Sequence, residues 1–244
     1  MFIGSGTLIN VIAIIGGASL GVLIGGRIPD RTRALITDVL GLITILGAAS
    51  ALAYIASERY MDSLPQGWPL LAILASLLIG GVIGSALNLE AKLESFGQYL
   101  RGRFRADREG TFVEGFLTSS LLFVIGPLAI LGSISDGMGS GIDQLILKSS
   151  LDFFAAIAFA ASLGWGVAAS AIPVGVYQGL WTIAGFGLGS VLTDYQIDAM
   201  TIVGGLMLVS IGLGLLKIKT IAVGNLLPAL ALAPVIAWVL HQFV

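Results

Sequence analysis

Long apolar segments alternate with short polar connections along the whole chain. We expect eight of these segments to be helices, near residues 5–26, 34–57, 67–88, 113–133, 143–164, 167–188, 198–216 and 220–241. Each is close to the roughly 20 mainly apolar residues that a helix needs to cross a bilayer. The pattern therefore predicts an all-α, polytopic membrane bundle with seven or eight transmembrane segments, built as a single domain over residues 1–244.

Two places decide between seven and eight crossings. The gap near residue 165 carries no charge and has to be a tight turn. The fourth segment contains Gly126-Pro127 and then a glycine-rich run at 132–139, both of which interrupt a regular helix. This stretch is either a broken helix that crosses the membrane or a re-entrant hairpin. In the second case the side assigned to every later connection changes.

The longest polar stretch, residues 89–112, has the pattern of an interfacial helix. Leu89, Leu93, Phe96 and Leu100 recur at helical spacing, with charged and polar residues between them. A basic run follows, comprising Arg101, Arg103, Arg105 and Arg108. We expect an amphipathic, basic connection that lies on the cytoplasmic membrane surface. An anchor for topology is the favoured interpretation, and a lipid-specific or regulatory site is the alternative.

The distribution of basic residues predicts the orientation. Three follow the first segment, five follow the third and two follow the seventh, which together are ten of the twelve Lys and Arg residues. If all eight segments cross, these ten lie on one side, and the positive-inside rule makes that side cytoplasmic. We therefore expect both termini outside, in a multi-pass protein of a cytoplasmic membrane.

Composition restricts the function as well as the location. Hydrophobic residues make up 57% of the chain and charged residues 11%, against roughly 25% charged in soluble domains. A net charge of −2 gives no electrostatic basis for binding nucleic acid. There are no cysteines and one histidine, and no nucleotide-binding or hydrolase motif is recognisable. We expect no catalytic residues, no metal site, no cofactor and no enzymatic activity.

Two ionisable residues stand inside an apolar segment, where charge is costly and usually functional. Lys148 and Asp152 are four positions apart and so share a helix face. If the helix begins near Asp143, Asp152 lies about 14 Å along it, close to the midplane of the bilayer. The pair is either an internal ion pair that joins helices or part of a site for a substrate, ion or proton.

Further candidate site residues lie where other apolar segments carry polar groups or helix breaks. Tyr177 and Gln178 fall near the middle of the sixth segment, one turn after Pro173, which frees a backbone carbonyl. Ser119 and Ser120 lie in the fourth segment, and Asn225 precedes Pro228 in the last one. Transporters expose backbone and polar groups to ligands at such breaks, although a simple packing kink explains them equally well.

Glycine pairs mark two of the segments as close-packing helices. Gly17 and Gly21 in the first segment and Gly80 and Gly84 in the third have GxxxG spacing. Helix packing is the favoured interpretation of this likeness, and an internal duplication is the alternative. These faces also lead us to expect a homodimer.

Several runs resemble a known family over essentially the whole chain. They are Phe112-Val113-Glu114-Gly115-Phe116-Leu117-Thr118-Ser119-Ser120, Lys148-Ser149-Ser150-Leu151-Asp152, Tyr177-Gln178-Gly179 and Gly224-Asn225-Leu226-Leu227-Pro228. In these runs the chain is similar to the prokaryotic integral membrane family called domain of unknown function 554, the YqgA-like proteins. The resemblance implies a multi-spanning protein of a prokaryotic membrane, sometimes regarded as a transporter, and supplies no substrate or catalytic residue.

We interpret the chain as a secondary transporter or permease for a small solute or ion, with a polar site near the midplane. The site residues we expect are Asp152, Lys148, Gln178, Ser119, Ser120, Tyr177 and Asn225. One alternative is a channel for an ion or solute, which requires a continuous hydrated pore. Another is a non-transporting scaffold or sensor, in which Lys148 and Asp152 would be paired and sealed from any cavity. The expected partners are the lipid bilayer, the solute or ion, and a second copy of the chain.

Overall fold

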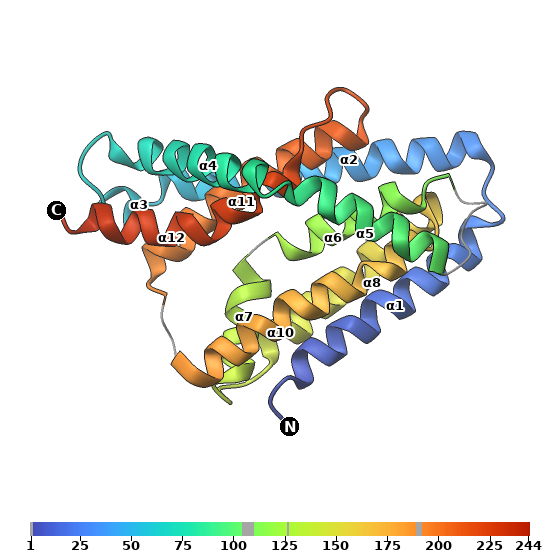
Figure 1. Cartoon of the computed structure of the whole chain (residues 1–244), viewed down its shortest axis with the longest axis horizontal. Helices are drawn as coiled ribbons and strands as arrows, with labels where there is room; N and C mark the ends of the chain where they lie inside the picture. The colour runs from blue at the N-terminus through green and yellow to red at the C-terminus, as the bar shows by residue number, and fades with distance from the viewer. Residues whose placement is uncertain (1, 104–109, 126, 189–191) are drawn as a thin grey trace. The chain divides into compact units, whose positions relative to one another are not determined.

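The computed structural model describes residues 2–103, 110–125, 127–188 and 192–244. The described residues form helices and no strand (Figure 1), which confirms the expected all-α fold. The helices, in chain order, are α1 (Ser5–Gly25), α2 (Asp30–Leu52), η1 (Ala53–Ala56), α3 (Glu58–Met61), α4 (Trp68–Ala86), α5 (Leu89–Arg103), α6 (Phe112–Val124), α7 (Pro127–Gly137), α8 (Asp143–Leu163), α9 (Gly166–Ala169), α10 (Ala171–Leu188), α11 (Asp194–Leu215), η2 (Val223–Leu226) and α12 (Leu227–His241).

Among the described residues, seven spans are long and apolar enough to cross a membrane. They are Ser5–Gly25, Ala34–Ala56, Trp68–Ala86, Asp143–Leu163, Gly166–Gly187, Asp194–Leu215 and Val223–His241. Helices α6 and α7 become an eighth if they are taken together, with a bend of 63° between them. The bend falls at the Gly126-Pro127 break, of which Gly126 lies outside the described residues.

The chain forms two compact units, which we describe separately. Unit 1 comprises Met1–Leu40 and Leu93–Val191, and unit 2 comprises Gly41–Lys92 and Leu192–Val244. Helices α2 and α5 contribute residues to both units. The candidate site residues 119, 120, 148, 152, 177 and 178 all belong to unit 1, whereas residue 225 belongs to unit 2.

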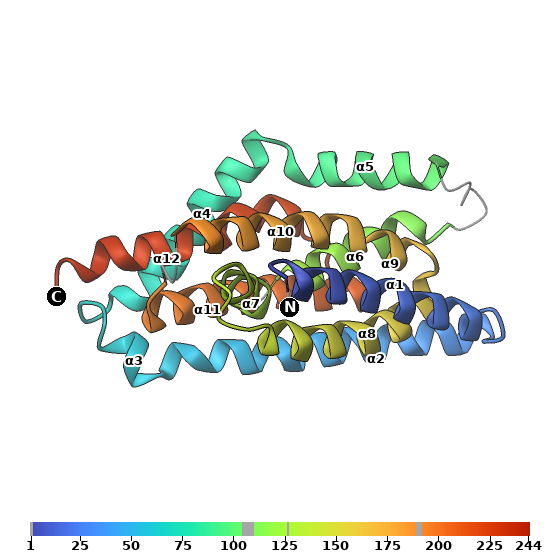
Figure 2. The ribbon, with the colours of Figure 1, turned by 90° about the horizontal axis from the view of Figure 1, so that it is seen from below.

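Helix α1 runs alongside α8 in unit 1, in the same direction along the chain (Figure 1, Figure 2). A Cβ atom at Gly17 would overlap the carbonyl oxygen of Phe153, and one at Gly21 would overlap that of Ile157. The absence of side chains at these two positions therefore allows the backbones of the two helices to approach closely. Asn10, which lies two turns before Gly17 on α1, is within hydrogen-bonding distance of Asp152 on α8.

Helices α6 and α7 contact opposite ends of α8. At the start of α6, the Thr111 hydroxyl donates to the carbonyl of Leu163, the last residue of α8, at 3.1 Å. In α7, Gly132 faces Leu145 in the first turn of α8. The α6–α7 pair thus extends along the whole length of α8, as expected for one crossing by a broken helix. A re-entrant hairpin would return to the end from which it started.

The parallel packing of α1 and α8 leads to the same count. Two spans that run in the same direction must be separated by an odd number of crossings. The candidates between them are Ala34–Ala56, Trp68–Ala86 and the α6–α7 pair, because α5 is not among the candidate spans. We therefore expect α6–α7 to form one crossing, which would bring the seven candidate spans to eight.

Unit 2 is also built on glycine contacts. Helix α4 packs on η2 and α12, where Gly80 meets Ala229 and Gly84 meets Asn225. The second half of α2 packs on α11, where Gly205 contacts Ala51. The glycine pairs of α1 and α4 that prompted the homodimer expectation thus lie against helices of their own units. A dimer would have to use a different surface.

Helix α5 occupies the first part of the predicted connection at residues 89–112. Within unit 1 its buried residues, Gly97 and Leu100, lie toward α6, and Leu100 joins a core cluster with Phe112, Phe116 and Ala169. Tyr99 on the same helix is exposed. Arg105 and Arg108, which belong to the predicted basic run, lie outside the described residues.

Candidate functional site

A buried polar cluster lies inside unit 1, where α1, α8 and α10 meet. Its members are Asn10 from α1, Lys148 and Asp152 from α8, and Gln178 from α10. Asn10 and Gln178 are 0% exposed, and Lys148 and Asp152 are 6% and 7% exposed. All four lie within candidate membrane spans. The cluster thus unites three residues predicted from the sequence with Asn10, which was not predicted.

Asp152 is the centre of the hydrogen bonding. Its Oδ2 atom accepts from the Lys148 ammonium at 2.5 Å and from Asn10 Nδ2 at 2.9 Å. The second N–H of Asn10 donates to Gln178 Oε1 at 3.2 Å. An ionised carboxylate only accepts hydrogen bonds, so it fixes which way the Asn10 amide faces, and Asn10 in turn fixes Gln178. The result is a directed relay from α8 through α1 to α10.

The relay leaves buried hydrogen-bonding capacity unused. Asn10 Oδ1, Gln178 Nε2 and Ser119 Oγ are buried and have no hydrogen-bond partner among the described residues. Turning either amide over would not satisfy them, since it would place an acceptor against Asp152 or a donor against a donor. Buried polar groups are normally paired, and each exception requires a specific explanation.

Close helix packing explains why these side chains meet. On α1, a Cβ atom at Gly6 would collide with Leu145, and one at Gly17 with the backbone of α8, so α1 and α8 approach closely on both sides of Asn10. A Cβ atom at Gly175 on α10 would lie 2.9 Å from Val11. Short side chains such as asparagine can therefore reach across both interfaces.

Two grooves lie at the end of unit 1 that holds the N-terminus of α1. One, of about 550 Å³, is lined by Ile3, Gly4, Thr7, Gly179, Thr182, Ile183 and Phe186. The other, of about 350 Å³, is lined by Phe2, Ile3, Asp136, Gly139, Gly141, Ile142, Asp143 and Ile146. At the larger groove the Thr7 and Thr182 hydroxyls form a hydrogen bond of 3.3 Å. Asn10 and Gln178 follow about one helical turn further into the unit.

Asp136 holds the N-terminus of α1 beside these grooves. Its carboxylate accepts from the backbone N–H groups of Gly4 at 3.1 Å and Gly6 at 3.0 Å. A carboxylate at this position satisfies free amide groups of the first turn and complements the helix dipole. These contacts of Asp136 are those of a residue that holds the N-terminus of α1 in place beside the grooves, and none of them points to a cation.

The other predicted site residues of unit 1 form no hydrogen bond with the cluster in the described part of the chain, and they lie in different surroundings. Ser119 is buried on α6, one turn before Phe123, whose ring centroid is 6.0 Å from Lys148 Nζ. Ser120 donates to the Phe116 carbonyl of its own helix and so is already satisfied. Tyr177 is half-buried, and its ring makes a T-shaped contact with the ring of Trp181, with the ring centroids 6.3 Å apart.

Asn225 performs a different task in unit 2. Its side-chain oxygen accepts from the backbone N–H of Glu90 at 2.9 Å, and the Glu90 carboxylate accepts from the N–H of Gly224. This reciprocal pair fixes the start of α5 against η2. Asn225 therefore does not join the buried cluster of unit 1.

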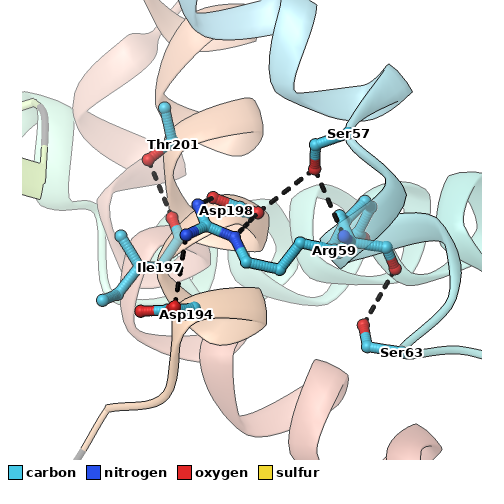
Figure 3. A network of polar contacts seen from close by, with 8 residues as sticks. Ser57, Arg59, Ser63, Asp194, Ile197, Asp198 and Thr201 are labelled. Atoms are coloured by element: carbon cyan, nitrogen blue, oxygen red, sulfur yellow. Dashed lines mark hydrogen bonds and ion pairs between the residues drawn. The ribbon is translucent and has the colours of Figure 1, made fainter.

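A second polar network, which sequence reasoning did not predict, lies in unit 2 (Figure 3). Asp198 on α11 is 0% exposed, and the guanidinium of Arg59 on α3 forms a two-pronged ion pair with it at 2.8 Å and 2.5 Å. Ser57 donates to the same carboxylate at 3.2 Å, and Asp194 pairs with Arg59 at 3.3 Å. The hydrogen bonds to Asp198 raise the pKa of Arg59 further above its ordinary value.

The two networks differ in whether all of their buried polar atoms have hydrogen-bond partners, which matters for binding. In unit 2 both oxygens of Asp198 are hydrogen-bonded, and no atom of the Arg59, Asp194 or Asp198 side chains is among the buried unpaired groups of the described residues. In unit 1 polar atoms of Asn10 and Gln178 remain free. We therefore identify the unit 1 cluster as the candidate binding site and the unit 2 network as a structural connection. Across the described parts of the chain, no group of three or more metal-binding side chains occurs.

This fold, with a polar cluster buried among helices that can cross a bilayer, is that of a polytopic integral membrane protein. The chain belongs to the family described as "Protein of unknown function (DUF554)", which matches residues 5–238. It is 31% identical to the "Uncharacterized membrane protein YdfK" of Bacillus subtilis over 239 residues, covering 98% of this chain and 97% of the relative. It is 32% identical to the "Uncharacterized protein YqgA" of Escherichia coli over 232 residues, covering 93% and 94%. No solved structure matches the chain.

Proposed function

We propose that the chain is a secondary transporter or related permease for a small solute in the cytoplasmic membrane of a prokaryote. Its binding site would comprise Asn10, Lys148, Asp152 and Gln178, with Ser119 nearby. The observation that carries the proposal is the unused hydrogen-bonding capacity of Asn10 Oδ1 and Gln178 Nε2 beside a buried ion pair. Each such unsatisfied group costs about 1–3 kcal/mol, and a bound polar solute would remove that cost.

The larger groove supports an access route to this site. It lies at the end where α1 begins, and the Thr7–Thr182 hydrogen bond separates it from Asn10 and Gln178. Two hydroxyl groups joined by one bond of 3.3 Å form a weak barrier that a small helix movement would open. If the termini lie outside, as the distribution of basic residues indicates, the route opens to the exterior.

A non-transporting scaffold is the second candidate, and one observation favours it. Lys148 and Asp152 are directly paired, and neither lines either of the two grooves in the described part of unit 1. A sealed ion pair is what a purely structural role requires. The unpaired amide atoms of Asn10 and Gln178 are the reason to prefer a binding site, since a structural network gains nothing from them. A channel would need a continuous pore, for which these grooves offer less support.

Transport can be tested with the purified protein in liposomes. The liposomes are incubated with a mixture of small amino acids, amines, carboxylic acids and sugars, and the contents are measured by mass spectrometry. We expect at least one component to accumulate in the presence of the wild-type protein. The double variant Lys148→Met with Asp152→Leu should fold, because both charges leave together, and should not accumulate that component.

Ser133→Ala is the matched control, because the Ser133 hydroxyl on α7 already donates to the Ala129 carbonyl of its own helix at 2.6 Å. It should keep wild-type uptake. Equal uptake by a well-folded double variant would remove the ion pair from the mechanism. A mixture from which neither protein takes up any component would favour the scaffold.

A further inference from the structure

The candidate site has no net charge. Lys148 and Asp152 supply one positive and one negative group, and α1 contains no ionisable side chain. The described part of α10 contains none other than the phenol of Tyr177. A solute that carries a net charge would therefore leave an uncompensated charge inside the membrane, which is costly. A solute without net charge would not.

The free hydrogen-bonding groups of the site include both donors and acceptors, and these lie on different residues. Among the described residues, the Lys148 ammonium donates one hydrogen bond and Gln178 Nε2 donates none. Acceptor capacity remains on Asn10 Oδ1 and on Asp152, which accepts the hydrogen bonds of Lys148 and Asn10 through Oδ2. The site thus offers a cationic donor with an amide donor, and an anionic acceptor with an amide acceptor.

We infer that the solute is a small zwitterion of the α-amino acid class with an uncharged side chain. This inference rests on the proposed function and specifies its substrate class. The carboxylate of the zwitterion would bind Lys148 and Gln178, and its ammonium group would bind Asp152 and Asn10. The internal ion pair would be exchanged for two ion pairs with the solute, so no charge is left unpaired at any stage.

The position of the two charges also predicts how the solute is oriented. Lys148 lies one turn closer than Asp152 to the N-terminus of α8, and this is the end where the grooves lie. The carboxylate of the zwitterion would therefore face the groove end and its ammonium group would lie deeper. An anion alone would engage Lys148 but leave Asp152 unpaired, and a cation alone would do the reverse.

A set of four probes of similar size tests the class. L-Alanine is zwitterionic, propionate is an anion, ethylamine is a cation and propionamide is a neutral amide. The melting temperature of the detergent-solubilised full chain is measured with each probe at millimolar concentration. We expect L-alanine to raise the melting temperature and to bind about tenfold or more tightly than each of the other three, because they lack one or both charge-assisted hydrogen bonds.

Two single variants test the same inference through a change in which probe binds best, so the result does not depend on the absolute affinity for any one probe. Asp152→Asn leaves Lys148 as the only charge and should shift the preference from L-alanine toward propionate. Lys148→Met leaves Asp152 alone and should shift the preference toward ethylamine. In both variants the ion that matches the remaining charge should also restore part of the lost thermal stability. Ser133→Ala should keep the wild-type preference.

Each outcome decides the inference. A wild-type protein that responds to propionate, ethylamine or propionamide as strongly as to L-alanine, or to none of the four, would overturn the zwitterion assignment. Preferential stabilisation by L-alanine without its uptake into liposomes would uphold the assignment and contradict transport. Uptake of propionate alone would uphold transport and contradict the assignment.

Discussion

The side-chain amide of Asn10 donates a hydrogen bond of 2.9 Å to the buried carboxylate of Asp152, although the two residues are 142 positions apart in the chain. The same amide also donates to Gln178, so a single residue of α1 links α8 to α10. This arrangement lets Asn10 and Gln178 be distinguished by experiment, because only Asn10 is fully used as a donor.

Replacement of Asn10 by leucine should destabilise the fold by about 1–3 kcal/mol. The substitution removes the hydrogen bonds that Asn10 donates to Asp152 Oδ2 and to Gln178 Oε1. Gln178→Leu removes an unpaired Nε2 group and leaves only one N–H of Asn10 free, so its effects on stability largely offset. We expect a melting temperature close to wild type together with loss of solute uptake. Equal destabilisation by both substitutions would identify Gln178 as a structural residue.

The contact between α1 and α8 predicts opposite results at two adjacent glycines. A Cβ atom at Gly17 would overlap the Phe153 carbonyl oxygen, whereas one at Gly16 has its nearest neighbour at 3.8 Å. Gly17→Ala should therefore separate the helices and lower the melting temperature. Gly16→Ala should be neutral or stabilising by up to about 1 kcal/mol, because alanine favours helix. Equal effects at the two positions would contradict the packing described for unit 1.

In unit 2, Asp198 and Asp194 provide another matched pair. Asp198 is 0% exposed and binds both prongs of Arg59, while the side chain of Asp194 is 71% exposed. Asp198→Asn should cost about 1–3 kcal/mol, because a buried charge-assisted interaction is lost. Asp194→Asn should cost less than about 1 kcal/mol, as is usual for exposed ion pairs. Thermal unfolding of the two variants in detergent measures both values.

We expect the buried phenol of Tyr60 to make the stability of the protein depend on pH in the alkaline range. Its side chain is fully buried, its hydroxyl donates to the Pro69 carbonyl at 3.1 Å, and burial raises its pKa well above the ordinary value. Above about pH 10 the unfolded chain releases this proton while the folded chain keeps it. The contribution of Tyr60 to stability is therefore complete below about pH 10 and is lost as the pH rises further. Tyr60→Phe should remove this part of the pH dependence, and an unchanged profile would contradict it.

The sequence was sufficient to predict the helices but not which of them meet. Apolar segments of spanning length follow directly from the requirement that backbone groups be satisfied inside a bilayer. The predicted segment 143–164 corresponds to α8 almost residue for residue. Lys148 and Asp152 were found because charges are rare within such segments.

Asn10 was missed because a single polar residue in an apolar helix has no meaning until its neighbours are known. Its presence within the first span was the available signal. Asp198 was missed for a related reason, since a charge at the end of a span normally faces solvent. Only the fold shows that Arg59, in a connection 139 positions earlier, covers it.

Thiol labelling of single-cysteine variants can count how many times the chain crosses the membrane. The chain has no cysteine, so the single variants Ile3→Cys, Arg103→Cys and Phe243→Cys each carry one thiol. Intact cells are treated with an impermeant thiol reagent, and permeabilised cells serve as the control. With eight crossings and external termini, positions 3 and 243 should react in intact cells, and position 103, which follows three crossings, should react only after permeabilisation. Reaction at position 103 alone would reverse the orientation but keep the count, because the termini would still share a side. Reaction at only one of positions 3 and 243 would mean an odd number of crossings. That result would make α6–α7 a re-entrant pair and contradict the parallel crossing of α1 and α8.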